Sequence, residues 1–480
     1  MRGYVAVFLM VLSSLTGLRA AEISYTLSSD KGRIEVQPFK HYHYAAFDLA
    51  APMHFVLSCS EKIETFEISP KSYGIKGVLN DKNELSFTLS RPQYVLVRIN
   101  DKYRFFLFAD APEIIPQGKQ RNILSLGIDN TGKKNETNSI QKALNAVSGT
   151  GEILLFPKGI YKINPLYIPS HTRIHLSRGA VLMADTQDIT PFKPTDEVET
   201  KRFIYFKDVE NVKITGYGEI NLNGKELRTK YGNDARIRLL FFVKARNIDI
   251  DGIFIKDPGS WNTQILYSDN ISLRHIKMMN DTELSNTDGF DPDASRNVLI
   301  ENCFAYCSDD NVAIKTTNYA KLLRDVDGIT VRKCVFLTKK SSLKVGTETR
   351  GEVMKNILFE DNDVIESDRG MALYCSDGAR FENIRYIRNR FERNHPDSKQ
   401  CGIQFVVNKR KPESRIGSIS GVLVKDCVFD CHFPKQSDIK ALEGSSGLQV
   451  VFDNLVIAGK KCTTAEDAKM KIQNSKVQFK

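Results

Sequence analysis

Short stretches of the first hundred residues alternate between apolar and polar positions. The alternation is found in residues 34–36, 55–57, 86–89 and 94–99. A period of two places successive side chains on opposite faces of a β-strand. We therefore expect short antiparallel strands and a small β-sandwich domain over residues 22–115. The apolar run at 105–108 closes this unit, and Pro112 and Pro116 mark a linker.

One amphipathic helix is predicted after the linker, in residues 137–146. Its apolar residues fall on one face and are Ile140, Ala143 and Leu144. Thr137 or Asn138 is the expected N-cap. A strand at 152–156 follows, and helical periodicity is then essentially lost. The predicted fold class is therefore all-β.

A strand motif repeats through the rest of the chain. Each copy begins with Asn, or with Gly in two copies, and continues with alternating apolar and polar residues. The copies start at Asn211, Asn247, Asn270, Asn297, Gly328, Asn356, Asn383, Gly421 and Asn454. Successive starts lie 23 to 38 residues apart, whereas the strands of a sandwich recur about every 8–12 residues. One strand motif per interval of this length is typical of a parallel β-solenoid, to which we assign residues 116–480.

The nine cysteines fit a structural role better than a disulfide framework or a zinc site. Their number is odd, the chain is long, and no C-x-x-C pair occurs. The pairs Cys303/Cys307 and Cys427/Cys431 have no histidine near them at ligand spacing. One position of the repeat holds small side chains that we expect to stack inside successive coils, namely Cys303, Cys334, Cys427, Asn362 and Asn389.

Residues 1–21 have the layout of a cleaved signal peptide. Arg2 precedes an apolar run from Tyr4 to Leu12, and small and polar residues lead up to Ala21. The run has about half the length that a membrane span needs. We therefore predict a secreted or periplasmic protein without a membrane anchor. The alternative is a buried N-terminal strand.

The charge balance favours an anionic polymer as partner. The chain of 480 residues has a formal charge of +10, and loss of Arg2 and Arg19 with the signal peptide would leave +8. No zinc-finger spacing, aromatic RNA-binding pattern or basic helix supports nucleic-acid binding. We expect no cofactor and no metal, since glycine-rich nucleotide motifs and metal triads are missing. The sequence leaves the oligomeric state open.

Acidic residues concentrate in two nearby motifs, NTDGFD at 286–291 and SDD at 308–310. Asp288 and Asp309 are 21 residues apart, close to one coil, so they should lie on neighbouring rungs about 4.8 Å apart. An inverting glycosidase needs one carboxyl group as acid and one as base, with room for a water. A third, Asp310, would raise a neighbour's pKa by repulsion. The alternative is that these aspartates cap turns or bind a structural cation.

The string from Asn286 to Lys315 resembles the signature of family 28 glycoside hydrolases, the polygalacturonase family. It carries N-T-D and then D-D, which members of that family place on consecutive turns. The segment 257–262 resembles the family's S-P-x-W segment and holds the single tryptophan. The resemblance covers roughly residues 125–460 and implies a right-handed parallel β-helix. The N-terminal sandwich is not part of the common pectinase core.

The resemblance also implies roles for individual residues. Asp309 would be the general acid, and Asp288 and Asp310 would hold and activate the hydrolytic water. Asn286 would orient Asp288. Lys315 would lie in the cleft, unless it is an exterior lysine. The implied substrate is a polysaccharide or an oligosaccharide.

Two motifs of the family are missing from this chain. The family's G-H-G falls at 339–341 and its R-I-K at 372–374, with 345–348 setting the register. Pectinases grip the galacturonate carboxylate with that Arg and Lys, which a tyrosine does not replace. We therefore expect a substrate that differs from plain galacturonate at the scissile bond, with Tyr374 stacking on a sugar ring. The other candidates for substrate binding are Lys340, Lys344, Glu348, Arg350 and Arg369. The four cations among them could meet an acidic group of the substrate, including a sulfate.

Other functions on the same fold stay open at this point. A polysaccharide lyase needs a Lys or Arg base and usually calcium, for which Asp288, Asp291 and Asp293 are candidate ligands. A uronate epimerase is a second alternative. A β-helix adhesin or glycan-binding module is a third, although it predicts a regular solenoid without a clustered acidic centre. The sequence does not distinguish endo from exo action, but inserted loops at 183–203 and 225–240 could close one end of a cleft.

Overall fold

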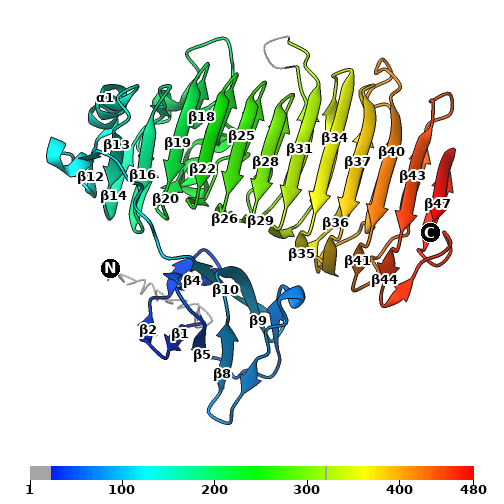
Figure 1. The fold of residues 1–480 in the computed structure, drawn as a ribbon, viewed down its shortest axis with the longest axis horizontal. Helices are drawn as coiled ribbons and strands as arrows, with labels where there is room; N and C mark the ends of the chain where they lie inside the picture. The colour runs from blue at the N-terminus through cyan, green and yellow to red at the C-terminus, as the bar shows by residue number, and fades with distance from the viewer. Residues whose placement is uncertain (1–22, 319–321) are drawn as a thin grey trace, which may run out of the picture.

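The computed structural model describes residues 23–318 and 322–480, which form a small sandwich and a long solenoid (Figure 1). The predicted signal peptide lies outside the described residues. None of the helices in the described part is long and apolar enough to cross a membrane. The predicted class, an all-β chain with a small β-sandwich before a right-handed parallel β-helix, is confirmed. The domain limits 22–115 and 116–480 stay a prediction.

The sandwich consists of two five-stranded sheets, with strand orders β2-β1-β5-β8-β7 and β3-β4-β10-β9-β6. Its strands are β1 (Tyr25–Ser29), β2 (Gly32–Ile34), β3 (Gln37–Phe39), β4 (Tyr42–Asp48), β5 (Met53–Cys59), β6 (Phe66–Ser69), β7 (Val78–Leu79), β8 (Glu84–Leu89), β9 (Gln93–Ile99) and β10 (Tyr103–Asp110). The expectation of antiparallel strands is wrong for one pair, because β10 pairs with β4 in parallel. Five strands separate the two in sequence, so the chain crosses over and re-enters this sheet from the same end.

The solenoid consists of three sheets, which we call sheets I, II and III. Almost all paired strands in them are parallel, and the antiparallel pair β44–β45 lies near the C-terminus. Sheet I contains the repeat motif. Its strands are β11 (Gln120–Asn122), β13 (Ile153–Phe156), β16 (Arg173–Leu176), β19 (Glu210–Thr215), β22 (Arg246–Asp251), β25 (Asp269–Arg274), β28 (Arg296–Glu301), β31 (Val326–Arg332), β34 (Val353–Glu360), β37 (Arg380–Ile387), β40 (Ser418–Lys425), β43 (Leu448–Asp453) and β47 (Ser475–Phe479).

Each coil then continues into sheets II and III. The strands of sheet II are β12 (Thr131–Asn135), β14 (Gly159–Ile163), β17 (Ala180–Ala184), β20 (Glu219–Asn221), β23 (Phe254–Lys256), β26 (Lys277–Met279), β29 (Phe304–Cys307), β32 (Val335–Thr338), β35 (Asp363–Ser367), β38 (Arg390–Asn394), β41 (Val428–Phe429), β44 (Val456–Ile457) and β45 (Lys460–Lys461). The strands of sheet III are β15 (Leu166–Tyr167), β18 (Arg202–Lys207), β21 (Arg238–Val243), β24 (Thr263–Leu266), β27 (Phe290–Asp293), β30 (Val312–Thr316), β33 (Ser341–Thr349), β36 (Arg369–Cys375), β39 (Ile403–Val407), β42 (Ser437–Ala441) and β46 (Met470–Gln473).

The structure explains why the repeat begins with Asn or Gly. Asn211, Asn247, Asn270 and Asn297 all have a φ between 51° and 58°, in the left-handed region that Asn tolerates better than most residues. Their amides stack from coil to coil, since Nδ2 of each donates to Oδ1 of the one before it at 3.0–3.1 Å. In the next coil the position is Gly328, with φ 73°. The repeated residue therefore makes the corner of each coil.

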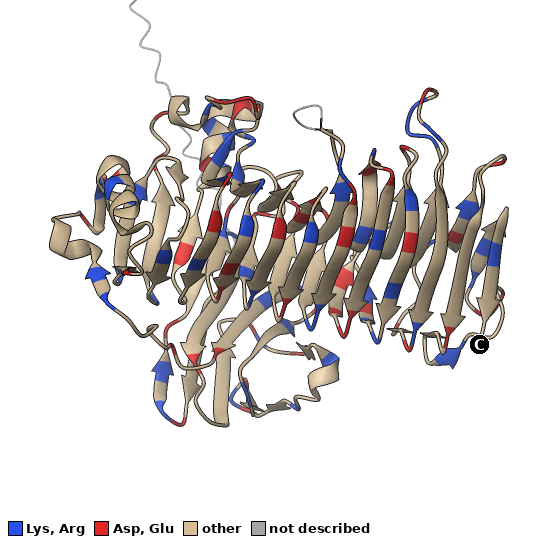
Figure 2. Cartoon of the chain, turned by 45° about the horizontal axis from the view of Figure 1, so that its top comes forward, with Lys and Arg blue, Asp and Glu red and all other residues tan. Residues whose placement is uncertain are grey.

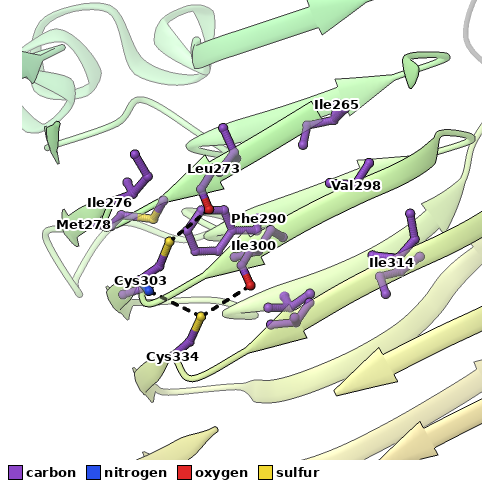
Figure 3. Packing of buried hydrophobic residues seen from close by; sticks show 14 of the residues in the cluster. Ile265, Leu273, Ile276, Met278, Phe290, Val298, Ile300, Cys303, Ile314 and Cys334 are labelled. Carbon is purple, nitrogen blue, oxygen red and sulfur yellow. Dashed lines mark hydrogen bonds between the residues drawn. The ribbon is translucent and has the colours of Figure 1, made fainter. Parts of the chain in front are cut away.

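Small residues stack inside the coils, as the repeat predicts (Figure 3). Cys303 and Cys334 are fully buried, and the Cys303 amide donates to Cys334 Sγ at 3.4 Å. The Cys334 amide donates to Asn362 Oδ1 at 3.1 Å, and Asn362 in turn donates to Asn389. All nine cysteines are free thiols. These side chains fill space and satisfy backbone groups inside the solenoid.

The predicted helix is present as α1 (Thr137–Val147), and it covers the N-terminal end of the solenoid (Figure 1). The predicted N-cap is wrong, because the cap residue is Glu136 and the Asn135 side chain accepts from the Thr137 amide. A second helix, α2 (Gly224–Tyr231), was not predicted. It overlaps the inserted segment at 225–240. Only two of its residues are buried, and its sequence lacks the apolar stripe that would have predicted it. Short 3-10 helices occur at Lys71–Tyr73, Ile123–Leu126, Thr190–Phe192 and Gly232–Ala235.

The sandwich packs on sheet II through an apolar cluster. The cluster contains Phe39, Tyr42, Tyr44, Tyr94, Leu96, Phe106 and Phe108 of the sandwich with Phe254, Met279, Phe304, Tyr306, Val335, Leu337 and Ile365 of sheet II. Two buried ion pairs join the units: Arg98 contacts Glu366 at 2.9 Å, and Lys277 contacts Asp110 at 2.9 Å. The sandwich therefore covers sheet II, while the acidic motifs lead into sheet III.

Candidate active site

The two acidic motifs end on neighbouring rungs, where the chain enters sheet III. Asp288 precedes β27, and Asp309 and Asp310 precede β30. These strands pair in parallel, with Phe290 opposite Val312, and the Gly289 amide donates to the Asp310 carbonyl at 2.8 Å. One carboxylate oxygen from each of the three aspartates lies within 4.8 Å of the others. The structure therefore brings the three predicted aspartates together.

Buried amide side chains hold the loop that carries Asp288. Asn262 Nδ2 donates to the Asp288 carbonyl at 2.8 Å, and Asn280 Nδ2 donates to the Thr287 carbonyl at 2.7 Å. The hydroxyls of Thr287 and Ser308 lie 2.7 Å apart and link the two motifs. Sequence reasoning missed Asn262 and Asn280. The only available signal was that Asn262 follows the single tryptophan.

Asp310 is held as a carboxylate. Its Oδ2 lies 2.6 Å from Lys344 Nζ, and its Oδ1 accepts from the Ser341 amide at 3.0 Å. Burial alone would raise the pKa of Asp310, but the Lys344 ammonium and these hydrogen bonds keep that pKa below its ordinary value. Asp310 is therefore ionised over the neutral and mildly acidic range.

Asp309 has the opposite environment. Its Oδ1 accepts from the Asp310 amide at 3.0 Å, and it is less buried than its two neighbours. Burial, followed by repulsion from Asp288 and Asp310, raises the pKa of Asp309 to about 7. Two adjacent aspartates thus differ in charge state near neutral pH, which is the arrangement that acid and base catalysis requires.

Lys315 is buried between two carboxylates and an aromatic ring. Its Nζ lies 3.2 Å from Asp288 Oδ2, 2.7 Å from Asp291 Oδ1 and 3.4 Å from the centre of the Trp261 ring. Lys315 therefore lies inside the site and is not an exterior lysine. Burial raises the pKa of both Asp288 and Asp291, and Lys315 opposes that rise. The role of Asp291 as a partner of Lys315 was missed by sequence reasoning.

The proposed calcium ligands of a lyase have other partners. Asp288 and Asp291 share the Lys315 ammonium. Asp293 accepts from the Thr317 amide at 2.8 Å and from Gln264 Nε2 at 3.0 Å. An ammonium group between two carboxylates compensates the charge that a cation would otherwise balance. This geometry disfavours a calcium site formed by these three residues.

Several of the predicted binding residues gather beside Asp310. Lys344 Nζ lies 5.5 Å from the centre of the Tyr374 ring, and the Arg369 guanidinium carbon lies 6.0 Å from it. Arg369 also donates to Ser341 Oγ at 3.2 Å. The Tyr374 hydroxyl donates to Gln404 of the next rung. An aromatic ring and two cations thus lie beside Asp310, on the side of the later coils.

The remaining predicted residues are further from the aspartates or bind other groups. Glu348 lies 2.6 Å from Arg410, which together with Lys315 lowers the pKa of Glu348 to about 2 in spite of burial. Arg350 donates to Asn318. Glu348 lies in a bulge of β33 between Val345 and Thr349, where the pairing with β30 shifts register, and Arg350 follows that bulge.

The last two predicted residues are partly or fully exposed. Lys340 is exposed, and its carbonyl accepts from the amides of Asp368 and Arg369. Asn286 is half-buried, with a φ of 58°, and its carbonyl accepts from Ser260 Oγ at 3.4 Å. Asp288 is oriented by Lys315 and by hydrogen bonds to its backbone, as described above.

Comparisons with known proteins agree with this geometry. The model of glycosyl hydrolases family 28 matches residues 159–476. A probable polygalacturonase from Vitis vinifera is 26% identical over 280 residues, which cover 52% of this chain and 56% of that protein. The chain spans about half the length of the curated relatives it matches.

Solved structures share the fold. A hyperthermoactive exopolygalacturonase from Thermotoga maritima aligns with a TM-score of 0.62 and 21% identity, over 76% of this chain and 91% of that one. A family 28 exopolygalacturonase from Yersinia enterocolitica aligns with a TM-score of 0.57 and 16% identity, over 93% and 98% of the two chains. With a family match over most of its length, the chain belongs to glycosyl hydrolases family 28.

Proposed function

We propose that this protein is an exported glycosidase that hydrolyses a glycosidic bond of an acidic polysaccharide with inversion. The observation that carries the proposal is the opposite shift of two adjacent carboxyl groups, in which the pKa of Asp309 rises to about 7 and that of Asp310 falls. Membership of family 28 supports a glycosidase. Export rests on the signal peptide predicted from the sequence.

In this proposal Asp309 is the general acid that protonates the leaving oxygen. Near pH 7 and below it carries the proton that this step needs, because burial and two neighbouring carboxylates disfavour its ionised form. Asp310 and Asp288 activate the hydrolytic water. Lys344 keeps Asp310 ionised, and Lys315, which contacts Asp288, opposes the rise in the pKa of Asp288 that burial causes.

The stereochemical outcome needs a separate test. Inverting enzymes usually hold their carboxyl groups about 6.5–9.5 Å apart and retaining enzymes about 5–5.5 Å apart. One oxygen of each aspartate lies within 4.8 Å of the others, a shortest approach that is smaller than the distance between whole carboxyl groups. We propose inversion because the family resemblance implies a water shared by Asp288 and Asp310. NMR of the first product would support inversion if the released anomer is opposite to that of the substrate, and would refute it if the anomer is the same.

The substrate is proposed to be anionic but not plain polygalacturonate. Lys344 and Arg369 flank the Tyr374 ring beside the aspartates, so a carboxylate or sulfate can be met by cations while a sugar ring stacks on Tyr374. Substituting Tyr374→Arg restores a cation in the R-I-K segment. We expect activity on polygalacturonate to appear or increase in that variant.

The deciding experiment compares wild type with Asp309→Asn on polygalacturonate, rhamnogalacturonan, sulfated galactans and neutral glucans. We expect wild type to release reducing sugar from at least one anionic polymer. Asp309→Asn should be slower by about 10²–10⁴-fold, the usual contribution of one acid or base. Equal rates for the two proteins would refute the role of Asp309. Unsaturated products that absorb in the ultraviolet would indicate a lyase, and binding without release of any product would indicate a glycan-binding protein.

A further inference from the structure

The outward-facing residues of sheet III form a continuous row that passes the active site. Strand pairing places Lys344 beside Ala372, Ala372 beside Gln404, Gln404 beside Asp438, and Asp438 beside Lys471. The row therefore runs from the residue that binds Asp310 across β36, β39 and β42 to β46. At about 4.8 Å per rung, these four steps span about 19 Å.

A second row runs beside the first and begins at the aromatic residue of the site. Tyr374 lies beside Val406, Val406 beside Lys440, and Lys440 beside Gln473. The Tyr374 hydroxyl donates to Gln404 and so joins the two rows. Two of the three side chains beyond Tyr374 are polar, namely Lys440 and Gln473, whereas a row covered by other parts of the protein is mostly apolar.

These rows line a groove of about 430 Å³. Its lining residues are Gln400, Cys401, Gln404, Lys435, Gln436, Asp438, Lys440, Lys471 and Gln473. The three lysines are exposed, whereas Asp438 and Gln404 are half-buried. Among the described residues none of these lysines forms an ion pair. Three lysines and one aspartate leave the groove with a net positive charge, and blue segments mark the last coils of the solenoid in Figure 2.

The groove lies on the C-terminal side of the active site, and Gln404 at its near end accepts a hydrogen bond from the Tyr374 hydroxyl. On the other side, the same face of sheet III is covered by a buried cluster, which contains Val198, Tyr205, Phe241, Val243, Leu266, Tyr267 and Ala294. The loop before β18 contributes to that cover, since Asp196 accepts from the Tyr205 hydroxyl at 3.0 Å. A chain that enters the active site therefore meets a covered face toward β18 and exposed lysines toward β46.

We propose that this groove, with Lys440 and Lys471 as its main contacts, binds the anionic part of a polysaccharide that extends from the cleavage site toward the C-terminal coils. The inference rests on the proposed function, because the position of the cleavage site gives the direction in which the polymer extends. Binding in the groove itself does not require catalysis. The groups recognised are carboxylates or sulfates on the sugar chain, which exposed ammonium groups bind as point charges. Gln404 and Gln473 provide hydrogen bonds to sugar hydroxyls.

The test measures binding without hydrolysis, in the Asp309→Asn background. Affinity electrophoresis or calorimetry with polygalacturonate, a sulfated galactan and neutral dextran compares that protein with one also carrying Lys440→Ala and Lys471→Ala. We expect about tenfold weaker binding of at least one anionic polymer, since two exposed ion pairs are lost. If binding weakens for polygalacturonate alone, the group bound is a carboxylate. If it weakens for the sulfated galactan alone, the group bound is a sulfate. The difference should shrink as salt is raised, because exposed charges are screened.

A matched control removes two exposed lysines elsewhere, with Lys142→Ala and Lys476→Ala on α1 and sheet I. It changes the net charge equally and should bind like the parent protein. Equal losses in the control and in the groove variant would overturn the proposal, as would no binding of either polyanion or an equal loss for dextran. Failure of wild type to hydrolyse any polymer would refute the proposed function while leaving a lysine-dependent binding result intact.

Discussion

The two ends of sheet III carry the same backbone but opposite outer surfaces. Toward the N-terminus, Phe241 lies in the outward-facing row, yet it is fully buried and stacks on Tyr205 with ring centres 5.5 Å apart. Toward the C-terminus, Lys471 occupies the same row and is exposed. The three aspartates lie between these ends. A parallel β-helix thus fixes where strands lie, while the loops and side chains outside the coils decide which part of a face is core and which part meets solvent.

This difference also explains how one face can hold a one-ended groove. The insertion between β17 and β18 packs over the N-terminal strands, where Arg202 donates to the carbonyls of Val198 and Thr200 at 2.9 Å. The C-terminal strands β39, β42 and β46 lack such a cover in the described part of the chain. Exposure therefore follows the position of the insertion and not the strand pattern.

The largest expected effect is on the free energy of unfolding. It comes from comparing two single alanine substitutions at opposite ends of the same outward-facing row. Phe241→Ala should lower the free energy of unfolding by about 3–5 kcal/mol, because it leaves a cavity in a packed cluster. Lys471→Ala should change it by less than about 0.5 kcal/mol, as is usual for exposed positions. Chemical denaturation of the two variants beside wild type measures both. Similar values for the two would contradict the contrast between the two ends.

Between the two ends, Lys315 contacts two buried carboxyl groups, those of Asp288 and Asp291. Lys315→Met should lower the free energy of unfolding by about 3 kcal/mol, because Asp288 and Asp291 remain buried without a counter-charge. Protonation of Asp291 limits the loss, since its pKa is already raised by burial. Adding Asp291→Asn to Lys315→Met should recover part of the stability. No recovery in the double variant would show that the loss comes from packing on Trp261.

The pH dependence of activity tests the aspartates themselves. Asp309 must be protonated to act as acid, so kcat/KM should fall about tenfold per pH unit above pH 7, where Asp309 loses its proton. Asp310 has a lowered pKa and stays ionised in mildly acidic solution. Lys344→Met removes the ammonium group that lowers both pKa values, so both limbs of the profile should move to higher pH. A profile unchanged by Lys344→Met would refute this assignment.

The smallest expected effect lies at the junction of the site and the groove. Tyr374→Phe removes the hydroxyl that donates to Gln404. The variant should bind the polymer more weakly by about 1 kcal/mol. The cost should appear as a KM for polymer that is about fivefold higher, with kcat little changed. Tyr103→Phe in the sandwich is a control for loss of a tyrosine hydroxyl. A fall in kcat instead of a rise in KM would indicate that Tyr374 acts on the reacting bond.

Much of the fold was predictable because it repeats. The Asn or Gly at the start of each motif, seen at Asn247 and Gly328, marks a corner with positive φ, and the spacing of these corners gives the length of a coil. The same spacing placed Asp288 and Asp309 on neighbouring rungs. Local propensity alone sufficed for α1, whose apolar stripe is clear, but not for α2, whose sequence lacks an apolar stripe.

The sequence by itself determined the all-β class, the parallel coils and the identity of the acidic cluster, because each depends on a periodic or local pattern. Only the tertiary structure decided the charge state of that cluster. Lys315 contacts Asp288 and Asp291 on the neighbouring rung. Lys344 likewise contacts Asp310 on the rung before its own. Burial and ion pairing act over a few ångströms in space between residues that lie about 24 to 34 positions apart in the chain, so no local pattern reports them.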